Sequence, residues 1–89
     1  MAEFLLEAYA RDVAASNLDT RRMEASANRR RNAGMQIRLL RTIFLPEDET
    51  SLVLFDAPSA EDVVTIVSDA GLPIERIAIA VLTPGEESP

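Results

Sequence analysis

The chain of 89 residues contains no cysteine and no histidine. Without cysteine, disulfides, thiolate nucleophiles and thiolate metal sites are excluded. Without histidine, the chain lacks the one side chain whose ordinary pKa lies near neutrality, so serine–histidine and histidine acid–base catalysis are excluded within one copy. Any acid or base must therefore be a carboxylate, a tyrosine or an arginine in an environment that shifts its pKa, and the sequence assigns no catalytic residue and no metal ligand.

Long apolar runs are also missing. The longest, Ile77 to Leu82, is far shorter than the roughly 20 residues needed to span a bilayer. The first residues include Glu3 and have no basic segment ahead of an apolar one, unlike a secretory signal peptide. We therefore expect a cytoplasmic protein that has no membrane partner.

Lysine is absent as well, so all nine basic residues are arginines, and the net charge is −6. Residues 1–45 contain eight arginines and five acidic residues, whereas residues 46–89 contain one arginine and ten acidic residues. Five arginines fall between Arg21 and Arg31, in a segment without aromatic residues. Because nucleic-acid binding needs net positive potential or aromatic stacking platforms, we expect no nucleic-acid partner and interpret this cluster as a solvated helix face.

Four apolar segments have the composition of β-strands, at residues 3–9, 35–45, 51–55 and 76–82. Pro46 cannot donate to a ladder and ends the second of them. The sequence "PEDET" that follows has about the length of a hairpin connection. We therefore interpret Glu47, Asp48 and Glu49 as a solvated turn rather than as a cation site.

The segment from Asp12 to about Ala33 is rich in Ala, Arg, Glu and Met, which favour a helix. Asp12, Ser16 or Asn17 is expected to cap its first turn, and Gly34 is expected to follow its last residue. Its apolar pattern is weak. The stripe that we expect to face the core is formed by Ala14, Leu18 and Ala25, with Arg22 and Arg29 projecting on the same side.

The second helix has clearer boundaries. Ser59 is the predicted N-cap with Asp62 three residues later, and Glu61 and Asp62 suit the positive end of a helix. Gly71 ends the helix and Pro73 prevents its continuation. The expected core-facing stripe consists of Val63, Ile66, Val67 and Ala70.

The resulting order of elements is βαββαβ, which favours an α+β, ferredoxin-like fold over residues 1–82 as a single domain, followed by a disordered acidic tail at 83–89. Right-handed crossovers place the first and third strands in the centre of a four-stranded antiparallel sheet and both helices on one face. Each strand offers apolar residues to both sides, whereas a sheet with one solvated face alternates more cleanly. We therefore expect a homodimer formed through the other face, as in a dimeric α+β barrel.

Four polar residues are candidates for a ligand-binding site: Glu7, Tyr9, Arg38 and Arg41. Glu7 lies within a predicted central strand, where a carboxylate without a partner is costly. Arg38 and Arg41 lie on the predicted edge strand, and their spacing of three predicts that they face opposite sides, so that at most one shares a face with Glu7. One interpretation is a structural ion pair at the dimer interface. The other is a polar pocket with Glu7 as base or ligand, Tyr9 as donor and an arginine that binds an anion.

Three stretches resemble the small bacterial nickel-binding ferredoxin-like proteins, a family first described as a domain of unknown function. They are "AEFLLEAY", "IRLLRTIFLPEDETSLVLFDAPSAEDV" and "AGLPIERI". The resemblance covers nearly the whole chain and is weakest in the first helix. It implies a βαββαβ fold, a dimer and, for at least one branch of the family, divalent nickel held by histidine and carboxylate side chains.

The chain departs from that family at the expected ligand position. Relatives often carry a histidine directly after the residue that matches Glu7, and here that residue is Ala8. Nickel prefers imidazole or thiolate ligands, whereas oxygen-only sites suit magnesium, calcium or manganese. The sequence therefore leaves a divalent metal open as a cofactor and does not predict nickel.

Three functions remain open on this sequence. The first is a non-enzymatic dimeric protein that binds a small molecule or a metal ion. The second is a cofactor-free isomerase, cyclase or oxygenase that uses the pocket of carboxylate, tyrosine and arginine side chains, and it rests on analogy of fold. The third is a purely structural dimerisation module.

Overall fold

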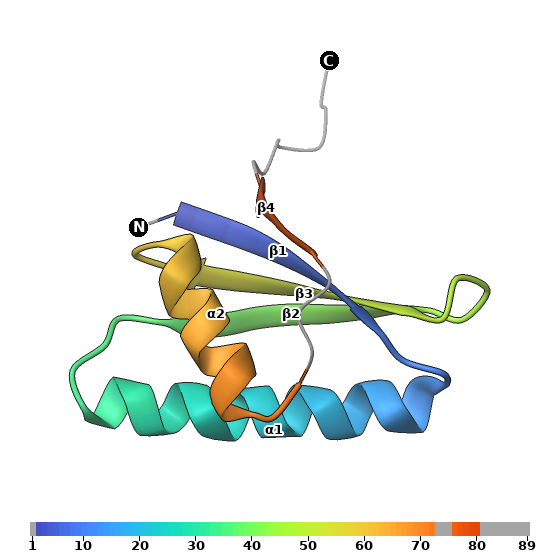
Figure 1. The fold of residues 1–89 in the computed structure, drawn as a ribbon, viewed down its shortest axis with the longest axis horizontal. Coiled ribbons are helices and arrows are strands. Elements are labelled where there is room, and N and C mark those ends of the chain that lie inside the picture. Colours follow the sequence, from blue (N-terminus) through green and yellow to red (C-terminus); the bar gives the residue numbers. More distant parts are fainter. Residues whose placement is uncertain (1, 73–75, 81–89) are drawn as a thin grey trace, which may run out of the picture.

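The computed structural model of the chain describes residues 2–72 and 76–80. It contains six elements in the order predicted (Figure 1). They are β1 (Ala2–Tyr9), α1 (Val13–Asn32), β2 (Arg38–Leu45), β3 (Thr50–Ala57), α2 (Ala60–Asp69) and β4 (Arg76–Ala80). The last two residues of the predicted fourth strand and the predicted acidic tail lie outside the described residues. In the part of the chain that is described, no helix is both long and apolar enough to cross a membrane.

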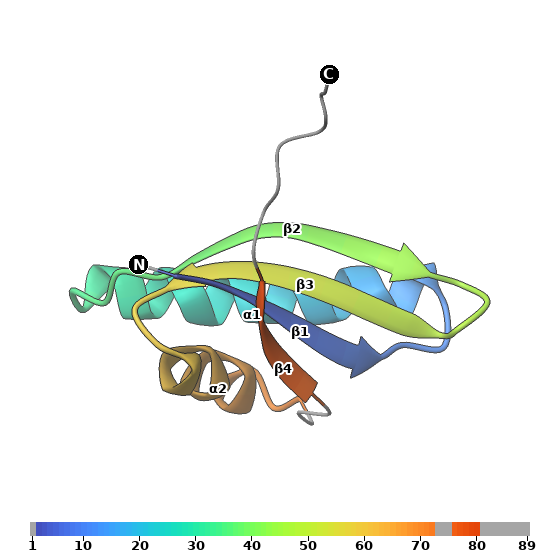
Figure 2. The same ribbon diagram turned by 90° about the horizontal axis from the view of Figure 1, so that it is seen from above.

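The four strands form one antiparallel sheet in the order β2-β3-β1-β4 (Figure 2). This order confirms that the first and third strands are central and that the second and fourth lie at the edges. Both helices pack against the same face of the sheet, with α1 running along its underside in the view of Figure 1. The ferredoxin-like βαββαβ arrangement predicted from the sequence is therefore present.

Local sequence explains where the helices begin and end. The Asp12 carboxylate accepts a hydrogen bond from the Ala15 N–H at 2.9 Å, so Asp12 is the N-cap of α1. Ser59 caps α2 in the same way by accepting from the Asp62 N–H at 3.3 Å. Gly34 and Gly71 follow the helix ends at φ of +99° and +77°, a conformation that costs glycine little.

The hydrophobic core lies between the helices and the sheet. The apolar side chains of β1 and β3 that face the helices alternate with residues of the opposite face. The helix α2 contributes the predicted residues Val63, Ile66 and Val67, all fully buried, with Ala70 packed against them. Outside α2, the largest buried apolar side chains are Phe4, Leu6, Met23, Ile37, Val53 and Phe55, of which Met23 belongs to α1.

The face that α1 buries differs from the predicted one. Ala14, Leu18 and Ala25 are exposed, Leu18 to 45% of its surface, and Arg22 and Arg29 are exposed as well. The buried residues of α1 are instead Ser16, Met23, Ser26 and Ala27. Serine and alanine are small, so the helix axis can lie close to the sheet, and hydroxyl groups can bond across the contact. The predicted core-facing stripe of α1 was wrong because it was based on apolar residues alone, and two of the buried residues are serines.

Two hydroxyl contacts join α1 to the sheet. The Ser51 Oγ of β3 donates to the Ser16 Oγ at 2.6 Å in the buried layer. The Thr20 Oγ1 lies 3.2 Å from the Thr42 Oγ1 of β2. These bonds satisfy side chains that would otherwise be costly to bury.

The edge strand β2 contains an irregularity that the sequence did not reveal. Leu39 pairs with Phe55 and Arg41 pairs with Leu54, so Leu40 is an extra residue without a Cα partner on β3. Such a bulge reverses the alternation of side chains after it. Leu39 and Ile43 would share a face in a regular strand, whereas here Leu39 pairs with Phe55 and Ile43 with Leu52, on opposite faces of the sheet.

Candidate functional site

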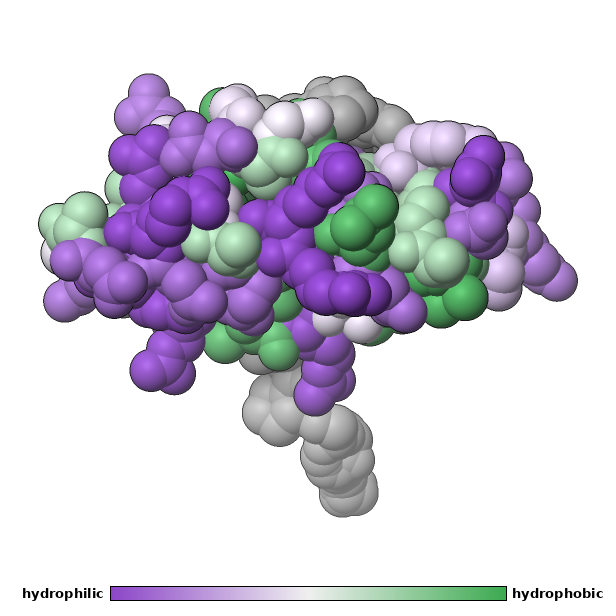
Figure 3. All heavy atoms as spheres, turned by 90° about the horizontal axis from the view of Figure 1, so that it is seen from below, coloured by the Kyte–Doolittle hydropathy of each residue, from purple (hydrophilic) through white to green (hydrophobic). Residues whose placement is uncertain are grey.

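The sheet face opposite the helices is apolar in its middle. The register places Leu5 of β1 beside Leu54 of β3 and Ala78 of β4, and Leu52 of β3 beside Ile43 of β2. The Ile43 side chain remains 47% exposed. The helix side is mostly hydrophilic, with separate hydrophobic areas among the hydrophilic side chains (Figure 3). Within the described residues, the open sheet face therefore carries a group of neighbouring apolar side chains, of which Leu5, Leu52 and Leu54 are partly exposed and neither helix covers any.

Glu7, Tyr9 and Arg41 share this open face. Glu7 pairs with Leu52, Tyr9 pairs with Thr50 two residues further along β1, and Arg41 pairs with Leu54. Glu7 is half-buried, Tyr9 is 55% exposed and Arg41 is exposed. A carboxylate, a phenol and a guanidinium thus border the apolar area of this face. Arg41 lies two residues and two strands from Glu7, within the combined reach of two extended side chains.

The prediction that Arg38 and Arg41 face opposite sides is wrong. Arg38 pairs with Asp56 and Arg41 pairs with Leu54, two residues apart on β3, so both arginines face away from the helices. The bulge at Leu40 is the reason, since it adds one residue between them. Arg38 nevertheless lies level with Glu3 and Asp56, four residues and about 13 Å along the sheet from Glu7.

A residue that sequence reasoning did not select lies next to Glu7. The register of β1 and β4 pairs Glu7 with Arg76, the single arginine in the second half of the chain. The sequence did contain the two residues concerned, Glu7 in the first predicted strand and Arg76 in the fourth, and these strands are expected to be neighbours in a ferredoxin-like sheet. What was missing was the register between them.

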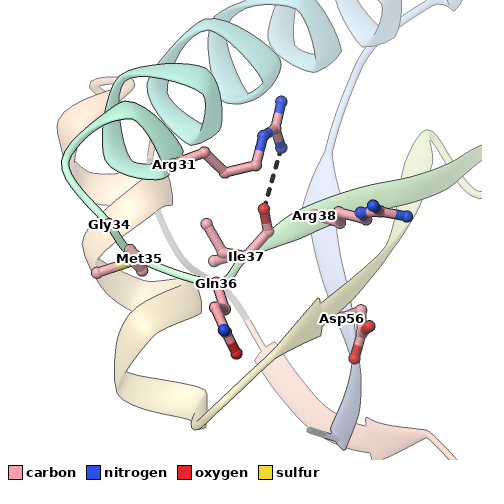
Figure 4. A pocket seen from close by; sticks show the side chains of 7 residues that line it. All are labelled: Arg31, Gly34, Met35, Gln36, Ile37, Arg38 and Asp56. Carbon is pink, nitrogen blue, oxygen red and sulfur yellow. Dashed lines mark hydrogen bonds between the residues drawn. The ribbon is translucent and has the colours of Figure 1, made fainter.

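A second group of side chains surrounds a surface pocket of about 460 Å³ at the start of β2 (Figure 4). Its walls are formed by Arg31, the connection from Gly34 to Ile37, and the neighbouring residues Arg38 and Asp56. The Arg31 Nη1 donates to the Ile37 carbonyl oxygen at 3.0 Å, which holds the guanidinium over the connection. Sequence reasoning missed this pocket because the residues come from three separate elements.

The acidic turn between β2 and β3 is a structural connection, as predicted. The Asp48 N–H donates to the Leu45 carbonyl at 3.2 Å and the Glu49 N–H to the Pro46 carbonyl at 3.3 Å. Glu47, Asp48 and Glu49 are all exposed. The Glu49 carbonyl accepts from the Ala10 N–H at 2.9 Å, so the turn also fixes the end of β1.

The donors present do not fit nickel. The chain has neither of the side chains that nickel prefers, since it contains no histidine and no cysteine. Within residues 2–72 and 76–80, no three carboxylates gather into a group that could hold a metal ion. The described residues of a single copy therefore do not form a metal site.

The helices carry their own charged contacts away from the open face. Arg30 of α1 bonds to Asp69 of α2 through its Nε at 2.9 Å and through Nη2, which joins the C-terminal ends of the two helices. Burial raises the pKa of the Asp19 carboxyl above its ordinary value of 3.8, and Arg22 partly offsets this effect. Asp19 lies on α1 and not in the candidate site, so its raised pKa has no role there.

No family model matches this chain, and no curated protein matches it. Among solved structures, the crystal structure of SCO4226 from Streptomyces coelicolor A3(2) is similar, with a TM-score of 0.73 and 17% sequence identity. The match covers 92% of this chain and 99% of that chain. At this level of identity the similarity supports the fold alone: the chain shares its ferredoxin-like architecture with SCO4226 over nearly its full length.

Proposed function

We propose that this chain is a non-enzymatic homodimeric binding protein, built like the small nickel-binding ferredoxin-like proteins that its sequence resembles but without nickel as its ligand. Two copies pack through their open sheet faces and enclose a site bordered by Glu7, Tyr9 and Arg41. The observation that carries the proposal is the apolar area formed by Leu5, Ile43, Leu52 and Leu54 on a face that neither α1 nor α2 covers.

The charges on this face also favour a second copy as its cover. Arg41 lies on the edge strand β2, whereas Glu7 lies on the central strand β1. A two-fold axis parallel to the strands sets β2 of one copy opposite β4 of the other and next to its β1. Arg41 of each copy then approaches Glu7 of the other, which complements charge across the interface.

The chemistry of the enclosed site points to a small organic molecule with an apolar body and a polar group. Leucine and isoleucine side chains form the floor, and the Glu7 carboxylate lies at its border. Pockets of this kind bury the apolar part of a ligand and orient it through a few polar groups. A divalent cation held by Glu7 from both copies is the competing ligand.

The dimer is tested by substituting one residue of the open face. Leu54→Glu places a charge in the proposed interface, and we expect the dimer dissociation constant to rise at least about 100-fold, because burying an unpaired carboxylate is costly. Leu18→Glu is the matched control, since Leu18 is exposed on the helix side. Sedimentation equilibrium measures both variants, and circular dichroism verifies their folding. A wild-type protein that is monomeric at micromolar concentration contradicts the proposal.

The ligand is tested by isothermal titration calorimetry on chelator-stripped protein with nickel, magnesium and manganese, and by native mass spectrometry for a copurified organic molecule. We expect no heat with nickel and a bound organic mass that Glu7→Gln removes. If magnesium or manganese binding releases heat and Glu7→Gln abolishes it, the ligand is a divalent cation and not an organic molecule. A dimer that binds neither would leave the purely structural function.

One observation favours a second function. Glu7 and Tyr9 lie two residues apart on the same face of β1, where a carboxylate base and a phenol donor act on one substrate. With Arg41 as the anion-binding group, the same site could transfer a proton from a carbon acid. The test is exchange of deuterium into the copurified molecule: exchange that Glu7→Gln abolishes supports an isomerase-type enzyme, and binding without exchange excludes it.

A further inference from the structure

We propose that the pocket at the start of β2 binds a small zwitterion of the acidic amino acid type, with its carboxylates on Arg31 and Arg38 and its ammonium group on Asp56. This site is separate from the open-face site of the proposed function, and it is complete within one copy. The three charged side chains line one pocket of about 460 Å³, within the size range of small-molecule sites (Figure 4).

Arg31 is held in position before any ligand arrives. Its Nη1 donates to the Ile37 carbonyl at 3.0 Å, and its Nη2 donates to the Asn28 Oδ1, with the Glu24 carboxylate at 3.7 Å. A guanidinium has five N–H donors, so these two bonds leave others for a ligand carboxylate. The loss of side-chain entropy on binding is therefore smaller than for a free surface arginine.

Arg38 and Asp56 are direct cross-strand partners, yet no ion pair joins them among the described residues. Arg38 is exposed and Asp56 is half-buried. Opposite charges in this position normally stabilise a sheet by pairing. Here each remains available to a ligand that carries both charges itself, and an α-amino acid brings a carboxylate to Arg38 and an ammonium to Asp56.

The balance of charge selects the class of amino acid. Two arginines and one aspartate line the pocket, which favours a ligand with two carboxylates and one ammonium group. Met35 and Ile37 form the apolar part of the wall, against which the methylene groups of the ligand can lie.

The test is an NMR titration of the full chain, labelled with nitrogen-15, at constant ionic strength. The probes are L-glutamate, glutarate, which lacks the ammonium group, and inorganic phosphate. We expect saturable shifts of the Gly34, Gln36 and Arg38 amides with L-glutamate at millimolar affinity, the range for a ligand of this size. Glutarate should bind at least about fivefold more weakly, because Asp56 repels it.

Two variants assign the roles of the charges. Asp56→Asn should abolish the preference for L-glutamate over glutarate, and Arg38→Gln should weaken both at least about fivefold. Arg29→Gln, an exposed arginine outside the pocket, is the control and should change neither. The proposal is overturned if L-glutamate gives no saturable shift, if glutarate or phosphate binds the unchanged protein as tightly, or if Arg29→Gln weakens binding as much as Arg38→Gln.

Discussion

Two buried serines on the same helix provide a sharp test of how α1 packs against the sheet. Ser16 is 2% exposed, and its Oγ accepts a hydrogen bond from the Ser51 Oγ at 2.6 Å. Ser26 is fully buried, and its Oγ has no hydrogen-bond partner among the described residues. Replacing each serine by alanine makes the same chemical change in two different environments. We therefore expect one variant to raise the free energy of unfolding and the other to lower it.

The magnitudes follow from the cost of burying a hydroxyl. An unsatisfied buried hydroxyl costs about 1–3 kcal/mol, and alanine is better than serine in a helix by up to about 0.5 kcal/mol. Ser26→Ala is therefore expected to raise the free energy of unfolding by about 1.5 kcal/mol. Ser16→Ala leaves the Ser51 hydroxyl buried without its partner, so it should lower the free energy of unfolding by about 1 kcal/mol.

Thermal and urea unfolding followed by circular dichroism at one protein concentration measures both effects. For a chain of this size, a change of 1 kcal/mol moves Tm by about 4–8 °C. The Tm values of the two variants should therefore differ by at least about 10 °C. The double variant Ser16→Ala/Ser51→Ala removes both partners and should be more stable than Ser16→Ala alone. A destabilised Ser26→Ala, or two variants that shift in the same direction, would refute the assignment of these hydroxyls.

Three further variants test the charge, the turn and the bulge. The raised pKa of Asp19 means that the folded state holds this proton more tightly than the unfolded chain, so stability falls as pH rises from 3.8 through the raised value. Asp19→Asn should remove that slope in urea titrations run from pH 3 to 7. Gly34→Ala should lower the free energy of unfolding by about 1–2 kcal/mol through backbone strain at φ +99°. An added Cβ meets no atom within 4 Å, so no steric clash contributes; an unchanged urea midpoint would contradict this. Deletion of Leu40 should leave the circular dichroism spectrum intact because it is the unpaired residue of β2, whereas deletion of Ile43 should unfold the chain by reversing the faces of the residues after it.

Local signals were sufficient for most of the fold. Asp12 and Ser59 have the oxygen that an N-cap requires, and glycine follows each helix, so boundaries could be placed within a few residues. The α2 stripe was predictable because its buried residues are all aliphatic. The α1 stripe was not, because half of its buried positions are serines, and a serine in the sequence does not reveal whether its hydroxyl meets a partner or solvent.

The candidate site shows a different limit. Glu7 and Tyr9 could be placed on one face from strand alternation alone, because β1 is regular over its whole length. Arg38 and Arg41 could not, because their relation depends on one unpaired residue between them, and nothing in "RLLRT" marks Leu40 as that residue. The pocket at Arg31 and Asp56 lay further beyond reach, since it forms only when the end of α1 and the start of β2 are placed beside β3.

The bulge has a consequence for how the two proposed sites relate. It places Arg41 on the same face as Arg38, but the two arginines have different neighbours: Arg41 lies beside Leu54 and the apolar area, and Arg38 lies beside Asp56. Because Glu7 and Arg38 are about 13 Å apart along the sheet, a small molecule bound by one does not contact the other. Arg41→Gln should therefore weaken binding at the open face while leaving the L-glutamate titration unchanged, and Arg38→Gln should do the reverse. Equal effects of both variants on both ligands would mean that a single charged surface, rather than two sites, is responsible.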